Sequence, residues 1–205
     1  NKLPFKELIE ETIIVDANST DDTQTVAKKY QCKFILEGDK KGFGAAIIEG
    51  IFNSKSFYSV VLDGDGSKNP NYIFNLIKSI EKNNDDFVFA TRYGKEAGSD
   101  DDTWLTYFGN RIFSNLGKLM FGLKINDILH TFFICKTSKF QNLKFKYSNF
   151  SFCVELPILV NKSQYNYSEI PSYERPRIAG EVKVNSFIDG FIIFKSMISL
   201  YLNTK

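Results

Sequence analysis

The chain has 205 residues, 43% of them hydrophobic, and its 26 basic and 24 acidic side chains leave a formal net charge of +2. This length and apolar content suit one compact domain with a substantial core, so we expect residues 1–205 to form a single domain. The near balance of charge excludes the strongly basic surface of a nucleic-acid-binding protein, and no nucleic-acid partner is expected.

The histidine and cysteine content narrows the chemistry. His130 is the one histidine, which excludes a metal centre built from several histidines, and its apolar surroundings favour a structural role. The cysteines form no CxxC pair, so we expect reduced thiols at Cys32, Cys135 and Cys153. Because the charged first residues also lack the apolar run of an export signal, a cytoplasmic location is expected.

Short apolar runs alternate with helix-length segments over the first half of the chain. Four of these runs have the composition of strands: 11–16, 33–37, 58–63 and 86–91. This alternation predicts an α/β fold in which helices flank a mostly parallel sheet. Ligands bind beyond the carboxyl ends of the strands in such a sheet, so the functional residues should follow the strands.

Two segments show the apolar spacing of helices, and we expect both apolar stripes to face the core. The first begins at Pro70 and comprises Ile73, Leu76, Ile77 and Ile80. The second comprises Leu105, Phe108, Ile112, Leu116 and Leu119.

The start of the chain is unusual for a parallel sheet, because residues 3–11 are expected to be helical and no strand precedes the one that begins at Thr12.

The pattern is less regular after residue 130. We expect a strand at 131–135, a helix near 152–163 and another strand near 165–170. The apolar segment 187–202 is too short and too charged to span a bilayer, which takes about 20 apolar residues. Two interpretations stay open for it: a helix that covers the sheet, which we favour, or an amphipathic helix at a membrane surface.

The most informative motif is VVLDGDG at 60–66, where two carboxylates separated by one glycine follow directly on a predicted strand. Asp63 and Asp65 can then face the same cleft. Carboxylate oxygens are hard ligands suited to Mg²⁺ or Mn²⁺, and such an ion commonly bridges to substrate phosphates. A tight turn is the competing interpretation, because aspartate and glycine are favoured in turns.

Two further motifs follow predicted strands. In the first, Asp16 ends a strand and can accept hydrogen bonds from a base or ribose, while residues 19–21 can cap the next helix. In the second, at 38–50, lysines and glycines precede a helix whose N-terminus favours anions. Neither motif is specific alone.

Taken in order, seven segments resemble those of family 2 glycosyltransferases, particularly the dolichyl-phosphate mannose synthase and polyprenyl-phosphate glycosyltransferase branch. They are VDANSTDDT, KKGFGAAIIEG, LDGDGSKNP, ATRY, GNRIFSNLGKLMFGLKINDILHTFF, FCVELPILV and YERPRIAGEVK. The resemblance covers almost the whole chain and implies a GT-A-type nucleotide-sugar-binding fold. The family's first strand has no counterpart here, which suggests a truncated chain.

The resemblance also implies roles for individual residues. The metal, Mg²⁺ or Mn²⁺, would be held by Asp63 and Asp65. Contacts to the donor, a GDP- or UDP-sugar, would come from Asp16, Asn18, Lys41, Gly42, Asp63, Arg92 and Lys183. Catalysis would rest on Asp65, Asp127 and Arg177. Arginine suits this site because its guanidinium gives fixed bidentate donors to phosphate.

Three departures from the family pattern weaken the donor contacts but leave the metal pair in place. Ala17 replaces an aspartate, Ser67 a glutamine and Thr131 a glycine. These changes keep open a catalytically inactive nucleotide-sugar-binding protein. A sugar nucleotidyltransferase is disfavoured, because the glycine- and arginine-rich nucleotide loop of that class is missing from the sequence.

The expected reaction is an inverting transfer in which an acceptor oxygen attacks the anomeric carbon. A polyprenyl or dolichyl phosphate acceptor needs no strong base, since its oxygen is already anionic. A sugar hydroxyl, as in a soluble polysaccharide glycosyltransferase, needs a carboxylate to take the proton; Asp127 is our first candidate and Glu155 our second. The lipid acceptor would place the protein peripherally at the cytoplasmic face of the membrane.

Overall fold

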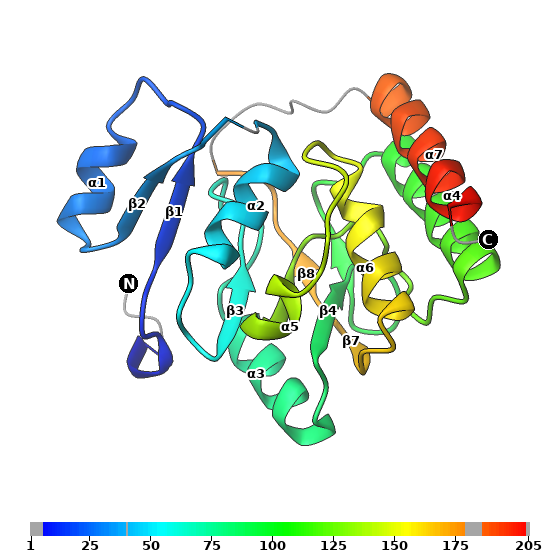
Figure 1. Ribbon diagram of the computed structural model, residues 1–205, viewed down its shortest axis with the longest axis horizontal. Helices are drawn as coiled ribbons and strands as arrows, with labels where there is room; N and C mark the ends of the chain where they lie inside the picture. Colours follow the sequence, from blue (N-terminus) through cyan, green and yellow to red (C-terminus); the bar gives the residue numbers. More distant parts are fainter. Residues whose placement is uncertain (1–5, 40, 179–185, 204–205) are drawn as a thin grey trace.

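The computed structural model describes residues 6–39, 41–178 and 186–203 (Figure 1). Its N-terminal part contains a short 3₁₀ helix, η1 (Lys6–Leu8), then β1 (Ile13–Asp16), α1 (Thr23–Lys29) and β2 (Lys33–Leu36). The two strands pair in parallel, with Ile14 opposite Phe34. This β-α-β arrangement is the one that the sequence predicts.

The largest sheet has the strand order β3-β6-β4-β7. Its strands are β3 (Tyr58–Val61), β6 (Phe133–Lys136), β4 (Phe87–Thr91) and β7 (Tyr167–Pro171). The central strand β6 runs antiparallel to β3 and β4, whereas β4 and β7 are parallel. A third, short sheet pairs β5 (Gly98–Ser99) with β8 (Tyr173–Glu174). Apolar periodicity located the longer strands, but it does not reveal the antiparallel direction of β6.

Helices cover both faces of the largest sheet. They are α2 (Phe43–Phe52), α3 (Tyr72–Asn83), α4 (Trp104–Phe121), α5 (Thr137–Gln141), α6 (Phe152–Lys162) and α7 (Ser186–Leu202). Successive side chains of β4 point to opposite faces of the sheet, as in any strand, and so belong to two different apolar clusters. Phe87 and Phe89 pack with α2, α5 and α6, while Val88 and Ala90 pack with α3.

The predicted apolar stripe of α3 is buried, because Ile73, Leu76 and Ile80 all face the sheet. The expectation for α4 is wrong at four of its five positions, because among the predicted residues only Leu116 packs against the core. The apolar side chains at 105, 108, 112 and 119 are exposed, and the helix buries Ser114 and Gly117 instead. A β-carbon at Gly117 would lie 2.8 Å from Ile128 Cδ1, so the small residues let this helix approach the core closely.

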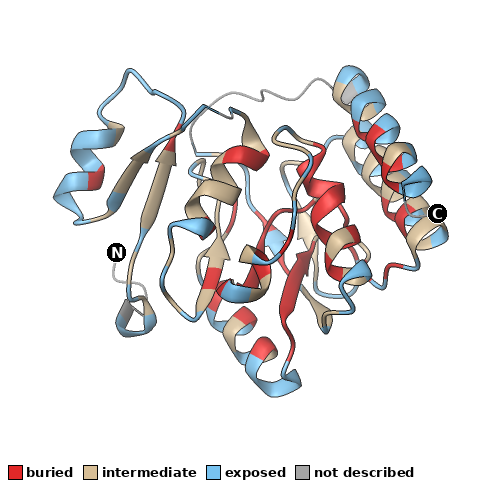
Figure 2. Cartoon of the chain, in the orientation of Figure 1, coloured by how far each residue is buried: buried red, intermediate tan, exposed pale blue. Residues whose placement is uncertain are grey.

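The last helix, α7, packs on α4 and α6 through one face only. Ile193, Ser196 and Met197 are buried there, whereas Phe191 and Phe194 on the other side are exposed (Figure 2). The helix is therefore packed on one side, as we favoured, but its main contacts are with α4 and α6 rather than with the sheet. No helix in the described ranges is long and apolar enough to cross a membrane.

Candidate active site

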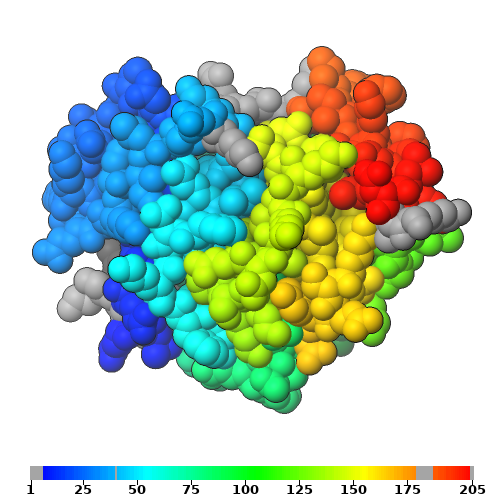
Figure 3. All heavy atoms as spheres, in the orientation of Figure 1, coloured from blue at the N-terminus to red at the C-terminus, as the bar shows by residue number. Residues whose placement is uncertain are grey.

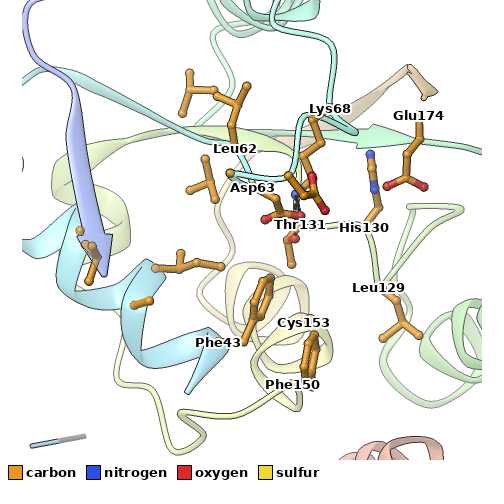
Figure 4. A pocket seen from close by; sticks show the side chains of 18 of the residues that line it. Phe43, Leu62, Asp63, Lys68, Leu129, His130, Thr131, Phe150, Cys153 and Glu174 are labelled. Atoms are coloured by element: carbon orange, nitrogen blue, oxygen red, sulfur yellow. Dashed lines mark hydrogen bonds and ion pairs between the residues drawn. The ribbon is translucent and has the colours of Figure 1, made fainter. Parts of the chain in front are cut away.

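A cleft of about 880 Å³ opens at the carboxyl end of β3. Asp63 and Asp65 both line it, with 30% and 19% of their side-chain surfaces exposed. They lie on the loop between β3 and α3, so the strand end positions both carboxylates in the cleft. Figure 4 shows Asp63 next to Lys68 and Thr131 within this pocket.

Each of the two carboxylates has a cationic neighbour. Lys68 Nζ lies 2.8 Å from Asp63 Oδ2 and donates a hydrogen bond to Thr131 Oγ1 at 3.0 Å. Asp65 Oδ1 accepts from the Ser67 backbone N–H at 3.0 Å, and Arg177 NH1 lies 3.6 Å from Asp65 Oδ2. The acidic pair is therefore held in place by partners from its own loop and from the loop after β8.

Backbone hydrogen bonds fix the loop after β8 to the acidic motif. Ile178 N donates to Asp65 O at 2.9 Å, and Arg175 N donates to Ser67 O at 2.9 Å. Gly66 allows this close approach, because it has a φ of +78° and a β-carbon there would lie 2.7 Å from Ile178 Cδ1. Arg177 is thereby placed between Asp65 and Asp101, whose Oδ2 accepts from Arg177 Nε at 3.0 Å.

Arg92 anchors the polar wall of the cleft. Its Nε and NH2 donate to the two oxygens of Asp127 at 2.8 and 3.0 Å, a bidentate arrangement. Its NH1 lies 3.2 Å from Glu174 Oε2 and 3.5 Å from Asp102 Oδ1. Burial by itself lowers the pKa of Arg92, but the three carboxylates, Asp127 first, raise it well above its usual value. The guanidinium stays charged.

His130 lies at the same wall but behaves as a structural group. The imidazole is buried, and Nε2 is 3.5 Å from Ser172 Oγ. Burial, with smaller contributions from Arg92 and Lys68, lowers the pKa of His130 well below its usual value. The ring is therefore neutral around neutral pH.

Comparison with known proteins decides the family. The profile of Glycosyl transferase family 2 matches residues 5–144, which is more than half of the chain. The chain belongs to glycosyl transferase family 2. Uncharacterized glycosyltransferases of Mycobacterium tuberculosis and Mycobacterium bovis are 24% identical to this family 2 chain over 181 residues, covering 88% of it and 81% of each relative.

Solved glycosyltransferases share the fold. Glucosyl-3-phosphoglycerate synthase from Mycobacterium tuberculosis, in complex with Mn²⁺, uridine diphosphate and phosphoglyceric acid, superposes with a TM-score of 0.73 at 15% identity, covering 95% of this chain and 68% of that one. Mannosyl-3-phosphoglycerate synthase from Rubrobacter xylanophilus superposes with a TM-score of 0.74 at 17% sequence identity. The match covers 96% of this chain and 64% of the synthase. The chain is thus a nucleotide-sugar glycosyltransferase with the GT-A fold.

The charge of the cleft of this family 2 enzyme fits a cation. Its described lining contains six carboxylates and three cationic side chains, an excess of three negative charges (six minus three): Glu11, Asp63, Asp65, Asp101, Asp102 and Glu174 against Lys68, Arg92 and Arg177. No group of three or more potential ligand side chains is placed to hold a metal within residues 6–39, 41–178 and 186–203. Two hard carboxylates suit an ion that keeps waters and substrate phosphate as its other ligands.

Four residues predicted to contact the donor are not among the described residues that line the cleft. Asp16 is buried at the end of β1, and its two oxygens accept from the backbone N–H and the hydroxyl of Ser19. Asn18 and Lys41 are exposed on loops. Gly42 precedes α2 with a φ of +126°, where a β-carbon would lie 2.7 Å from Ser148 O. Gly42 therefore serves close packing in this structure.

The predicted general bases are engaged elsewhere, which argues against that role. Asp127 is 1% exposed, and both of its oxygens accept from Arg92. Glu155 is equally buried, and its oxygens accept from the backbone N–H groups of Lys146 and Tyr147 at 2.8 and 2.9 Å. Neither carboxylate is among the described lining of the cleft. The remaining predicted contact, Lys183, lies outside the described residues.

Several charged residues of the cleft are not among the site residues predicted from the sequence. Lys68 carries the ammonium group beside Asp63, and Asp101, Asp102 and Glu174 hold the two arginines. The run of three aspartates at 100–102 was a usable signal, since adjacent like charges need cationic partners or solvent. Glu174 gave no such signal, because its contact with Arg92 joins residues 82 positions apart.

Proposed function

We propose that this glycosyltransferase transfers its sugar, with inversion and with a divalent metal, to a lipid phosphate of the polyprenyl type at a membrane surface. The observation that carries this proposal is the position of α4. One face of this helix lines the cleft, and the next face presents large apolar side chains to the exterior.

The cleft-facing side of α4 is polar. Thr103, Thr106 and Asn110 line the cleft, and Thr103 caps the helix by accepting from Thr106 N. The exposed side of the same helix is apolar, and its exposed large side chains are Trp104, Leu105, Tyr107, Phe108, Ile112 and Leu119. Soluble proteins rarely expose such a continuous apolar surface unless it binds something. A lipid phosphate could reach the cleft along α4 while its chain stays in the bilayer.

The adjacent helix α7 extends this apolar surface. It packs on α4, and its exposed side chains include Phe191, Ile192 and Phe194. Trp104 and Tyr107 lie at the cleft end of α4. Tryptophan and tyrosine are enriched where membranes meet water. These features suit an interfacial helix pair with its apolar faces in the lipid.

The chemistry of the cleft favours an acceptor that is already anionic. The described carboxylates that line it each have a cationic or hydrogen-bond donor partner, for example Asp101 with Arg177 and Asp102 with Arg92. A sugar hydroxyl would need one of them released to take its proton. A phosphate oxygen needs no base: it forms the new bond to the anomeric carbon while the bond to the departing diphosphate breaks, and the electron pair leaves with the diphosphate.

Asp63 and Asp65 would hold the metal, which when bound neutralises charge on the leaving nucleoside diphosphate. Arg177, on the loop fixed to the acidic motif, would then turn its guanidinium from Asp65 toward the diphosphate. Lys68 keeps Asp63 in position and offsets part of the negative charge of the cleft. Arg92 would act by positioning Asp102 and Glu174 rather than by touching the donor.

A small phosphorylated acceptor is the second candidate. Two solved enzymes of the same fold are synthases of glucosyl- and mannosyl-3-phosphoglycerate. Phosphoglycerate offers a phosphate to the same cationic side chains, although its reacting oxygen is a hydroxyl. The exposed apolar surface of α4 has no use in that reaction, and this makes the lipid acceptor our first choice.

The test compares acceptors directly. The purified chain is incubated with Mn²⁺, UDP- or GDP-sugars, and either polyprenyl phosphate in phosphatidylcholine vesicles, 3-phosphoglycerate or free oligosaccharides. We expect labelled sugar in the lipid extract, and its loss in Asp65→Ala but not in the exposed control Asp22→Ala. Transfer to phosphoglycerate alone would overturn the lipid acceptor, and full turnover of a folded Asp65→Ala variant would remove the metal assignment.

A further inference from the structure

Lys68 is a buried cation in the wall of the cleft. It is 4% exposed, and its Nζ lies 2.8 Å from Asp63 Oδ2 and 3.0 Å from Thr131 Oγ1 (Figure 4). Among the described residues, Asp63 is its one ion-pair partner. An ammonium group without such partners is costly to remove from water, so this contact holds the lysine in a defined position.

The backbone around Lys68 is fixed by the strand that follows the largest sheet. Lys68 forms an isolated β-bridge with Glu174, and the neighbouring Ser67 O accepts from Arg175 N at 2.9 Å. The lysine stem, by contrast, has four carbons and free rotation about its bonds. The ammonium group can therefore turn to a new partner within the cleft while the backbone stays in place.

The opposite wall of the cleft is aromatic, and its described lining residues include no carboxylate. On the face shown in Figure 3, α2 and residues 145–151 lie side by side, joined by a backbone hydrogen bond of 2.9 Å. The rings of Phe43 and Phe150 stack there with centroids 4.7 Å apart, across the cleft from Lys68 (Figure 4). In such apolar surroundings an ammonium group interacts strongly with any anion within its reach.

The hydroxyl group of Thr131 gives the lysine its second partner. Thr131 is one of the three departures from the family pattern, which has glycine at this position. Glycine has no side-chain oxygen, so Lys68 would then depend on Asp63 alone. Lys68, Thr131 and Asp63 therefore form one hydrogen-bonded unit, and the departure from the pattern has a structural reason.

Lys68 competes with a divalent metal for the carboxylate of Asp63. The ion pair neutralises Asp63, and a second cation at this carboxylate would lie close to the ammonium group, where like charges repel strongly in apolar surroundings. The diphosphate of a sugar nucleotide removes this conflict, because each of its phosphates carries a negative charge. The ammonium group of Lys68 then has a phosphate oxygen as an alternative to Asp63.

We infer that Lys68 couples metal binding to donor binding: it holds Asp63 until both ligands arrive and then passes from the carboxylate to the diphosphate. The inference rests on the proposed metal-dependent transfer from a sugar nucleotide. Lys68 forms and breaks no covalent bond in this role, and each ligand binds weakly without the other. The coupling is reciprocal, because the metal must raise donor affinity by the same factor as the donor raises metal affinity.

The test measures Mn²⁺ binding to the full chain by electron paramagnetic resonance, without any acceptor, and with or without UDP or GDP. Lys68→Met removes the competing cation, so Mn²⁺ alone should bind about tenfold more tightly than to the wild type, and the gain in Mn²⁺ affinity on adding the nucleotide should shrink about tenfold. Lys68→Gln, which keeps a donor for Thr131 but no charge, should behave in the same way. Lys82→Met changes an exposed lysine of α3 and is the matched control, which should bind as the wild type does.

A second measurement needs only the wild type. Acetic anhydride followed by mass spectrometry reports how accessible the amine of Lys68 is, and we expect slow labelling because this side chain is buried. Saturating Mn²⁺ alone should release the ammonium group from Asp63 and raise the labelling rate of Lys68 about tenfold, and adding the nucleotide should return it to the slow rate. Labelling of Lys82 should not respond to either ligand.

The outcomes separate this inference from the proposed function. Unchanged Mn²⁺ affinity in both Lys68 variants, while Mn²⁺ and nucleotide still bind together, would overturn the coupling and leave the proposed transfer intact. A labelling rate of Lys68 that is the same with and without Mn²⁺ would also overturn the coupling. No Mn²⁺ binding by the wild type, with or without either nucleotide, would overturn both.

Discussion

Arg92 connects three stretches of chain that are distant in sequence. Its partners Asp102, Asp127 and Glu174 lie 10, 35 and 82 positions away. The resemblance of ATRY to a family motif pointed to this arginine, but its predicted role was a donor contact. The partners could not be predicted, because a bidentate pair depends on where the strands place each side chain and not on local spacing.

Replacing Arg92 should destabilise the fold strongly. In Arg92→Met the carboxylate of Asp127 stays buried without its cation, and a broken buried pair costs about 3–5 kcal/mol. Urea unfolding of the variant and the wild type measures the loss. The double variant Arg92→Met, Asp127→Leu removes both charges and should recover most of it. If the single variant is as stable as the wild type, the pair does not hold this wall together.

His130 should make the free energy of unfolding depend on pH. In the folded chain the pKa of His130 is lowered, mainly because the ring is buried. In the unfolded chain an imidazole has a pKa of about 6.5. Below that pH the unfolded state binds a proton that the folded state does not. Stability contributed by the neutral ring is therefore present above pH 6.5 and is lost as the pH falls.

Urea unfolding at pH 7.5 and pH 5.5 tests this expectation. The His130 contribution should decrease by about 1.4 kcal/mol between these two values, since one pH unit below the unfolded pKa corresponds to about 1.36 kcal/mol. His130→Gln removes this contribution and leaves other titrating groups in place, so its pH dependence should be smaller by the same amount. Identical pH dependence in both proteins would show that the fold does not shift the pKa of His130, and would contradict this expectation.

Helix α4 shows where periodicity succeeds and where it misleads. The spacing of its apolar residues correctly predicted a helix over this segment. It also predicted that the apolar stripe faces the core, which is wrong, because Ser114 and Gly117 make the close contacts. A helix that packs through small residues and exposes its large apolar side chains has no apolar stripe that marks its buried face.

The exposed stripe of α4 should be needed for vesicle binding. We expect the wild type to sediment with vesicles that contain anionic lipid. Leu105→Ser with Phe108→Ser should lower the vesicle-binding constant by about a hundredfold or more, since each large apolar side chain contributes about 1.5–3 kcal/mol when buried. Phe57→Ser is a matched control, because Phe57 is 69% exposed but lies before β3. Equal loss in the control, or no binding by the wild type, would contradict this role.

Across the whole chain, local patterns identified strands and helices, but the spatial order of the strands came from the structure. Apolar runs located β1, β2, β3, β4, β6 and β7 within a few residues. The lining of the cleft could not be predicted, because it combines residues from β1, α2 and β3 that share no sequence motif.

Nucleoside diphosphates should stabilise the fold only together with a divalent metal. A ligand at 100 times its dissociation constant adds about 2.7 kcal/mol to the native state. For a chain of this size that corresponds to a rise in Tm of about 5–10 °C. UDP and GDP should each be measured with Mn²⁺, with Mg²⁺ and with a chelator, and the base that gives the larger shift identifies the donor.

Asp65→Ala should abolish the metal-dependent part of this rise in Tm. A shift that persists in this variant would place the nucleotide away from the acidic pair, and an unchanged Tm with every combination would contradict donor binding by this chain.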